Sequence, residues 1–186
     1  MQRTRLNGRL ATIITAVIGV CVVGLLIWFD RFTKNYFYDF FVTKNNQDVC
    51  IIKNFFYFTY ATNTGAGWSF LSGVSWAQTF FKVTTVIALA IMLFFSVYSL
   101  IKNKKWLFIS FSLCIAGAVG NFIDRIINGF VIDFISFIFG NYNFPVFNVA
   151  DICLTVGVIM LIVYLLFLDD NGVLRKNGKE NLSDNN

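Results

Sequence analysis

The sequence predicts an α-helical integral membrane protein with four transmembrane helices and a small sheet at one membrane face. Its 186 residues are 57% hydrophobic and only 13% charged, a balance too apolar for a soluble domain of this length. Four long apolar runs alternate with polar segments, and many of the Lys and Arg residues flank those runs. Basic residues in that position indicate membrane orientation, so no nucleic-acid partner is expected.

Each apolar run is long enough to cross a bilayer as a helix. The first, Leu10 to Phe29, holds no charge and would form about 30 Å of helix. It is too long for the core of a secretory signal peptide, and no small-residue cleavage site follows it, so we expect a permanent span. The other spans are expected at about 83–101, 106–123 and 146–168. The sequence thus predicts a membrane domain over residues 1–168 and a disordered polar tail over 169–186.

The long segment from 30 to 82 has the composition of a small β-rich unit. Its middle, Ile51 to Tyr60, is rich in Ile, Phe, Tyr and Thr, which favour strands. The stretch that begins at Asn63 has turn composition. A second candidate, Phe130 to Phe139, alternates partly around Asp133 and is expected to be a strand or an interfacial segment.

Basic residues also predict the topology. The N-terminal segment, the 102–105 loop and the C-terminal tail contain three Lys or Arg residues each, whereas the 124–145 segment contains only Arg125. The positive-inside rule then places both termini in the cytoplasm and the 30–82 and 124–145 segments outside.

Polar residues gather at the outer ends of the predicted spans. Asp151 lies inside the last apolar run, on the order of 7–8 Å below its outer end, where a carboxyl usually faces protein or water. Asp124 ends the preceding run, and we expect the two aspartates to meet. One could then act as general base and the other as general acid on a water molecule, which requires no histidine, metal or cofactor. Asn121 and Asn148 stand three residues before these aspartates, so on a helix each shares roughly the face of its Asp.

Other interpretations of single residues stay open. Asp124 followed by Arg125 also fits an ion pair at a helix end, and Asn63 with its glycines fits a plain turn. Lys82 and a serine such as Ser69 would make a Ser-Lys dyad, although Lys at the end of a span normally anchors it by snorkelling.

Two other classes of function are alternatives to a hydrolase with paired aspartates. One is a small transporter or proton relay, and the other is a non-catalytic membrane scaffold. The first would need polar residues throughout the membrane depth, and the inner half of the predicted spans lacks them. The second has no use for two inward carboxylates with flanking asparagines.

Five stretches, in this order, resemble the lipoprotein signal peptidase (signal peptidase II) family of bacterial membrane aspartyl endopeptidases. They are Asp30 to Lys34, Asn63 to Ser69, Gly120 to Arg125, Val131 to Phe134 and Phe147 to Asp151. The resemblance implies four helices with an extracytoplasmic β-cradle in the bacterial cytoplasmic membrane. It also implies cleavage of prolipoprotein signal peptides just before a diacylglyceryl-modified cysteine. The expected partners are these precursors and membrane lipids, with the enzyme acting as a monomer and without a cofactor.

The same resemblance assigns roles to individual residues. It places the catalytic pair on Asp124 and Asp151. It puts four residues along the substrate site: Asn63, Asn121, Arg125 and Asn148. It gives four others a supporting role: Asp30, Lys34, Gly65 and Asp133. The chain departs from the family pattern at Arg31, where Gln is usual, and at Gly67 and Trp68, which bear on the shape of the pocket.

Overall fold

The protein is mostly helical with a small antiparallel sheet, which confirms the predicted fold class. The computed structural model describes residues 2–65, 74 and 76–169. Within this part of the chain, four helices are long and apolar enough to cross a membrane. They are α1 (Gln2–Tyr38, continued by η1, Asp39–Thr43), α2 (Ala77–Ile101), α3 (Lys105–Ile127) and α4 (Val149–Val163, continued by η3, Tyr164–Leu168). The predicted tail beyond Asp169 lies outside the described residues, as do Gly67, Trp68 and Ser69.

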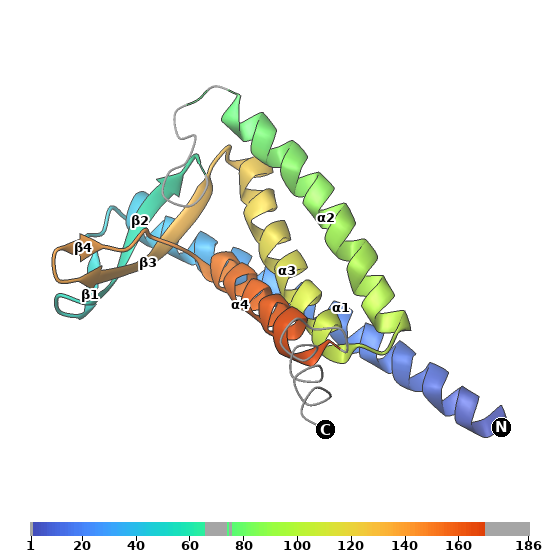
Figure 1. Ribbon diagram of the computed structural model, residues 1–186. Helices are drawn as coiled ribbons and strands as arrows, with labels where there is room; N and C mark the ends of the chain where they lie inside the picture. The colour runs from blue at the N-terminus through green and yellow to red at the C-terminus, as the bar shows by residue number, and fades with distance from the viewer. Residues whose placement is uncertain (1, 66–73, 75, 170–186) are drawn as a thin grey trace, which may run out of the picture.

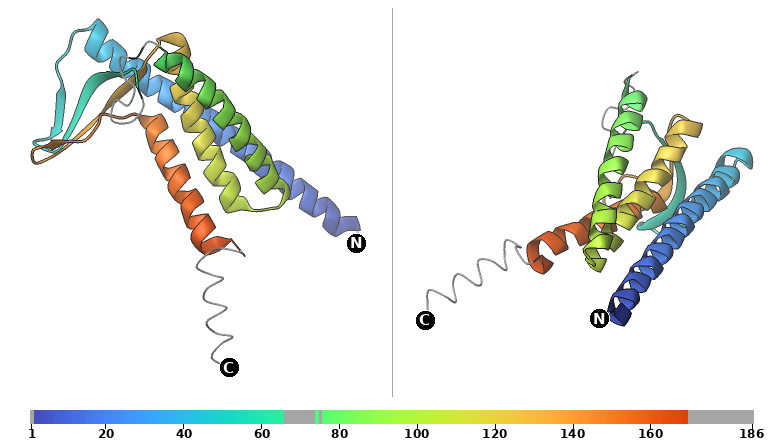
Figure 2. Two further views of the ribbon diagram at one scale, coloured as in Figure 1. Left: turned by 45° about the horizontal axis from the view of Figure 1, so that its top comes forward. Right: turned by 90° about the vertical axis from the view of Figure 1, so that its right-hand side faces the viewer.

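The helix α3 is the centre of the bundle. It packs against α1, α2 and α4, and Figure 2 shows α1 and α2 on either side of it. In the most apolar stretch of α3, half of the residues are buried inside the protein. In the corresponding stretch of α1, only 6% are buried. Polar groups that need protein partners are therefore best placed on α3 and on the helix faces turned toward it.

Glycines on α3 allow its neighbours to come close. A Cβ atom at Gly117 would lie 2.3 Å from the carbonyl oxygen of Ala150, and one at Gly120 would lie 2.7 Å from Asp30 Oδ2. Both distances are too short for a real Cβ, so α3 touches α4 and α1 here only because these positions have no side chain. The small residues near the end of the third span thus bring three helices together.

Four antiparallel strands form one sheet in the order β1-β2-β3-β4. They are β1 (Val49–Ile52), β2 (Phe56–Asn63), β3 (Val131–Phe139) and β4 (Tyr142–Asn143). The prediction that residues 30–82 supply the β-rich unit was therefore incomplete, because β3 and β4 come from the 124–145 segment. Residues 30–43 are helical, since α1 and η1 continue through them.

Aromatic side chains and one β-bridge hold the sheet against the bundle. The ring of Phe37 on α1 stacks on that of Phe134 with centroids 4.4 Å apart, and it lies 4.7 Å from the ring of Phe58. Phe147 forms an antiparallel bridge with Ile135, through backbone hydrogen bonds of 3.0 and 2.8 Å. As Figure 1 shows, β3 therefore lies beside the beginning of α4 and near the end of α3.

Candidate active site

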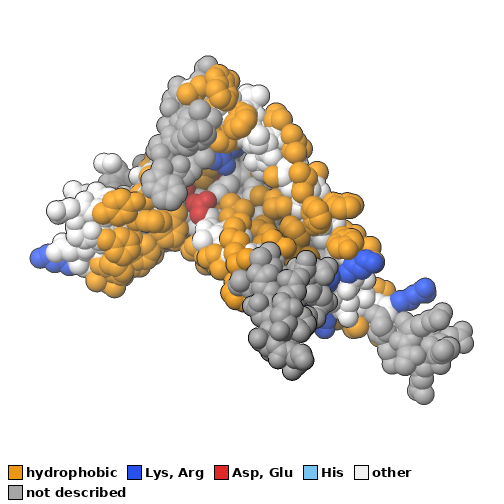
Figure 3. All heavy atoms as spheres, viewed as in Figure 1, with side chains coloured by type: hydrophobic (Ala, Val, Ile, Leu, Met, Phe, Trp, Pro, Cys, Tyr) orange, Lys and Arg blue, Asp and Glu red, His pale blue; other side chains and the backbone are white. Residues whose placement is uncertain are grey.

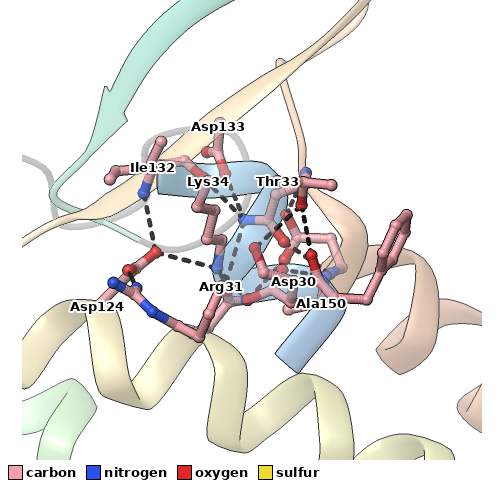
Figure 4. Close-up of polar contacts among 12 residues, drawn as sticks. Asp30, Arg31, Thr33, Lys34, Asp124, Ile132, Asp133 and Ala150 are labelled. Carbon is pink, nitrogen blue, oxygen red and sulfur yellow. Dashed lines mark hydrogen bonds and ion pairs between the residues drawn. The ribbon is translucent and has the colours of Figure 1, made fainter. Parts of the chain in front are cut away.

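A buried lysine on α1 joins the helices at this junction. The Nζ atom of Lys34 lies 2.8 Å from Asp30 Oδ2, 3.0 Å from Asp124 Oδ2 and 3.0 Å from Asn121 Oδ1. Lys34 is 0% exposed, and its three ammonium hydrogens face three acceptors. Figure 4 shows Lys34 between the two aspartates, which reach it from α1 and α3. A buried ammonium with this many partners is a fixed part of the structure.

Asp124 is completely enclosed by its partners. One carboxylate oxygen accepts from Arg31, and the other faces Lys34 and accepts from the Ile132 backbone N–H at 3.2 Å. Asp124 and Asp151 are connected through two residues: Lys34 contacts Asp124 and Asn121, and Asn121 donates to Asp151. Among the described residues, no direct hydrogen bond joins the two carboxyl groups. The assignment of Asp124 and Asp151 as the catalytic pair stays a prediction.

Asp30 ties this ionic cluster to α4. Its Oδ1 atom accepts from the backbone N–H of Ala150 at 2.9 Å, while its Oδ2 atom pairs with Lys34. The N–H of Ala150 belongs to the first turn of α4, where backbone donors have no partner within the helix. Asp30 therefore supports both the Lys34 cluster and the start of α4.

The start of α4 is organised by Asn148 and Asp151. Asn148 caps the helix: its Oδ1 atom accepts from the Asp151 N–H at 3.0 Å, and the Asn148 N–H donates to Asp151 Oδ2 at 3.1 Å. This reciprocal capping box satisfies two backbone donors and fixes the Asp151 side chain. The other oxygen, Oδ1, accepts from Asn121 Nδ2 at 2.7 Å. Each predicted asparagine thus contacts Asp151.

Asp133 on β3 is the carboxyl group that shares Asn148 with Asp151. The Nδ2 atom of Asn148 donates to Asp133 Oδ1 at 2.6 Å, and Asn63 also hydrogen-bonds to this carboxyl group. Asp133 is 2% exposed. Burial, and next the charge of Asp151, raise the pKa of Asp133 to about 7, although the two asparagines and Lys34 lower it in part. At neutral pH, Asp133 therefore exists in both its protonated and its ionised form.

The count of charges in this group agrees with a raised pKa of Asp133. Four acids and three bases meet here: Asp30, Asp124, Asp133 and Asp151, with Arg31, Lys34 and Arg125. Two of the bases contact Asp30 and Asp124 directly. Of the four acids, Asp133 has amide partners and is almost fully buried, and a proton on it leaves the group neutral. A buried charge without a cation is costly, and protonation removes that cost.

Arg125 connects the end of α3 to the end of β2. Its Nη2 atom donates to the carbonyl oxygen of Gly65 at 2.9 Å, and its guanidinium lies 5.2 Å from the centre of the Phe81 ring. The N–H of Gly65 in turn donates to Asn63 Oδ1 at 3.0 Å. The turn predicted after Asn63 thus also places that side chain next to Asp133.

Asp151 is accessible where Asp133 is not. Its side chain is half-buried, and Figure 3 shows acidic atoms in a hollow between the sheet and the helices. Through Asn148, Asp133 shares a hydrogen-bond partner with Asp151. The supporting role of Asp133 stays a prediction.

The fold and the site define a multi-pass membrane protein with a cluster of buried acids at one end of its bundle. The chain matches the signal peptidase (SPase) II family over residues 22–167. It is 40% identical to a lipoprotein signal peptidase of Listeria welshimeri over 148 residues, or 78% of this chain and 90% of the relative. It is 39% identical to one of Bacillus subtilis over 155 residues, or 82% of this chain and 94% of the relative.

The solved structures agree with this similarity. A bacterial membrane enzyme determined by the in meso method at 2.3 Å superposes with a TM-score of 0.67 at 35% identity, covering 83% of this chain and 90% of that one. A second, determined at 1.9 Å, gives a TM-score of 0.65, also at 35% identity, over 82% and 94% of the two chains. The chain belongs to the signal peptidase II family and is a membrane protease.

Proposed function

We propose that this protein removes signal peptides from prolipoproteins as an aspartic endopeptidase, cleaving before a diacylglyceryl-modified cysteine. The relatives are lipoprotein signal peptidases, and that name supports the substrate class. The observation that supports the aspartic mechanism is that Asp124 on α3 and Asp151 on α4 lie at one junction, where Lys34 contacts Asp124 and Asn121, and Asn121 donates to Asp151. The proposed catalytic pair is Asp124 and Asp151.

In this mechanism the two aspartates have different roles. One carboxylate of the Asp124–Asp151 pair removes a proton from a water molecule as the water oxygen attacks the carbonyl carbon of the scissile peptide bond. The other carboxyl group donates its proton as the bond to the amine breaks. The proton must then pass back between the two carboxyl groups before the next turnover.

The other polar residues hold this pair in place. Asn121 donates to Asp151, and Asn148 donates to Asp133 and caps the helix that carries Asp151. Asn63 and Arg125 lie where an extended substrate would pass between β2 and α3. Lys34 contacts both Asp124 and Asn121, so it fixes the carboxylate and the amide relative to each other.

Cleavage of a synthetic prolipoprotein tests the proposed activity. The purified protein should release the signal peptide from a precursor with a diacylglyceryl-modified cysteine. It should cleave the same precursor without the lipid at least about tenfold more slowly, because remote binding energy contributes to turnover. Equal cleavage of both precursors would contradict the lipid requirement, and cleavage of neither would contradict the proposed function.

The proposed orientation places both termini in the cytoplasm and the acidic site at the extracytoplasmic face, with one membrane domain over residues 1–168. One chain supplies every side chain of the site described above, which supports a monomer. Cys50 on β1 is exposed, so a membrane-impermeant maleimide should label it in intact spheroplasts. Labelling only after the cytoplasmic side is opened would contradict this orientation.

A further inference from the structure

A groove between α1 and α3, at the end of the bundle away from the sheet, has no role in the proposed reaction. Its cavity measures about 320 Å³, and its walls include Ile18, Gly19 and Val22 from α1 and Ile109 and Leu113 from α3. Gly19 brings the two helices together at the base, since a Cβ there would lie 2.4 Å from the Phe108 ring. The groove is therefore apolar along its length and closed along one side.

The mouth of the groove is polar and basic. A smaller cleft lined by Thr12, Thr15, Asn103 and Lys105 adjoins it, and Thr15, Lys105 and Phe108 line both cavities. Among the described residues, no acidic side chain forms an ion pair with Lys105, whereas Lys104 beside it is paired with Asp169 at 3.1 Å. Arg9 is exposed and lies one turn before Thr12, on the same helix face. Basic side chains are visible at this end of the bundle in Figure 3.

The length of the groove matches one membrane leaflet. Thr12 and Val22 are ten residues apart on α1, which corresponds to about 15 Å along the helix axis. The hydrocarbon core of a bilayer is about 30 Å thick, so the groove spans about half of it. An acyl chain that begins at the mouth would therefore follow the groove to the middle of the membrane.

We propose that this groove binds an anionic phospholipid of the leaflet opposite the active site, with one acyl chain along α1 and α3. The phosphate would lie at Lys105, Thr12 and Asn103, where its negative charge meets the Lys105 ammonium, which has no acidic partner in the described part of the chain. A signal-peptide helix fits this mouth less well, because its own positively charged n-region would face Arg9 and Lys105. In the proposed orientation, the lipid comes from the cytoplasmic leaflet.

Native mass spectrometry of the protein purified in a neutral detergent tests this site. Three probes are compared: phosphatidylglycerol, phosphatidylcholine with the same acyl chains, and glycerol 3-phosphate. Phosphatidylglycerol should be retained as a one-to-one adduct, about fivefold more than phosphatidylcholine, the effect expected of one basic residue near an anionic headgroup. Glycerol 3-phosphate should not be retained. Equal retention of both lipids, or retention of glycerol 3-phosphate at the level of phosphatidylglycerol, would overturn the proposal.

Variants locate the site. Lys105→Gln should remove the preference for phosphatidylglycerol, whereas Lys102→Gln should leave it unchanged. Lys102 is exposed at the same end of the bundle, but it lies over the Tyr98 ring and lines neither cavity. Ile18→Trp places a bulky side chain in the groove and should reduce retention of both lipids. If that variant does not fold, Ile109→Trp on the opposite wall gives the same test. An equal effect of the two lysine changes, or full retention in the filled variants, would show that the groove is not the site.

Discussion

Asp151→Asn is expected to lower the turnover number for a lipid-modified precursor at least about a thousandfold without unfolding the protein. Asn keeps the size of the side chain and can still accept from the Asn148 N–H and from Asn121, as Asp151 does. It cannot exchange a proton with water or with the leaving amine, and general acid or base catalysis of this kind contributes about 10²–10⁴-fold. The double variant with Asp124→Asn should be no slower than either single variant, because the two residues act as a unit. Losses that multiply in the double variant would contradict a shared step.

The pH dependence follows from the same pair. One carboxyl group must be ionised to act as the base and the other protonated to act as the acid, so kcat/KM should fall at both low and high pH. The profile is therefore bell-shaped, and its two apparent pKa values belong to the Asp124–Asp151 pair and not to either residue. A profile with a single limb would contradict a mechanism that needs both groups.

Lys34→Met is expected to cause the largest loss of stability of any single change at this site. It leaves Asp30 and Asp124 in the protein interior with only Arg31 as a cation. Breaking a buried ion pair in this way costs about 3–5 kcal/mol. For a chain of this size that corresponds to a decrease in melting temperature on the order of 10 °C.

Lys44→Met provides the matched control for this measurement. Lys44 is also a lysine near the end of α1, and its ion pair with Asp39 is equally short, at 2.8 Å. Both of those side chains are more than half exposed, and exposed pairs contribute little to stability. The melting temperature of Lys44→Met should therefore stay near that of the wild type. If Lys34→Met melted at the same temperature as Lys44→Met, the buried cluster would not be the support described here.

The sequence was sufficient to predict the four helices and the group of polar residues at one end of them. Apolar runs of bilayer length have few alternatives, and the spacing of Asn121 from Asp124 and of Asn148 from Asp151 is visible in one dimension. The full extent of α1 was not predictable in this way. The helix α1 continues to Tyr38 through a polar stretch because Asp30 and Lys34 have buried partners on other helices. Local hydropathy does not record such partners.

The surroundings of the aspartates were also hidden from sequence reasoning. Asp124 ends a span and follows an asparagine by three residues, but this local pattern does not show that Arg31 and Lys34 reach it from α1. The position of Asp133 depends on the bridge between Ile135 and Phe147 and on the pairing of β2 with β3. Both are long-range contacts, and they bring Asn63, Asp133 and Asn148 together only in the folded chain.

The central claim is that Asp124 and Asp151 form the catalytic pair, with Asp133 as a support beside them. Asp133→Asn provides the matched control, because a carboxyl with a raised pKa makes the folded protein lose stability as pH rises from about 4 through 7, and Asn does not titrate. At pH 8 this variant should melt no lower than the wild type, whereas Asp124→Asn should melt below it, since the Asp124 carboxylate is paired with Arg31 and Lys34.

The most direct measurement is therefore the turnover number of Asp124→Asn on the lipid-modified precursor, at a temperature where this variant is folded. The expected result is no detectable cleavage by the folded variant, whereas Asp133→Asn should keep measurable cleavage. Cleavage by Asp124→Asn within about tenfold of the wild-type rate would contradict the assignment of Asp124 to the catalytic pair, because a general acid or base contributes at least about a hundredfold.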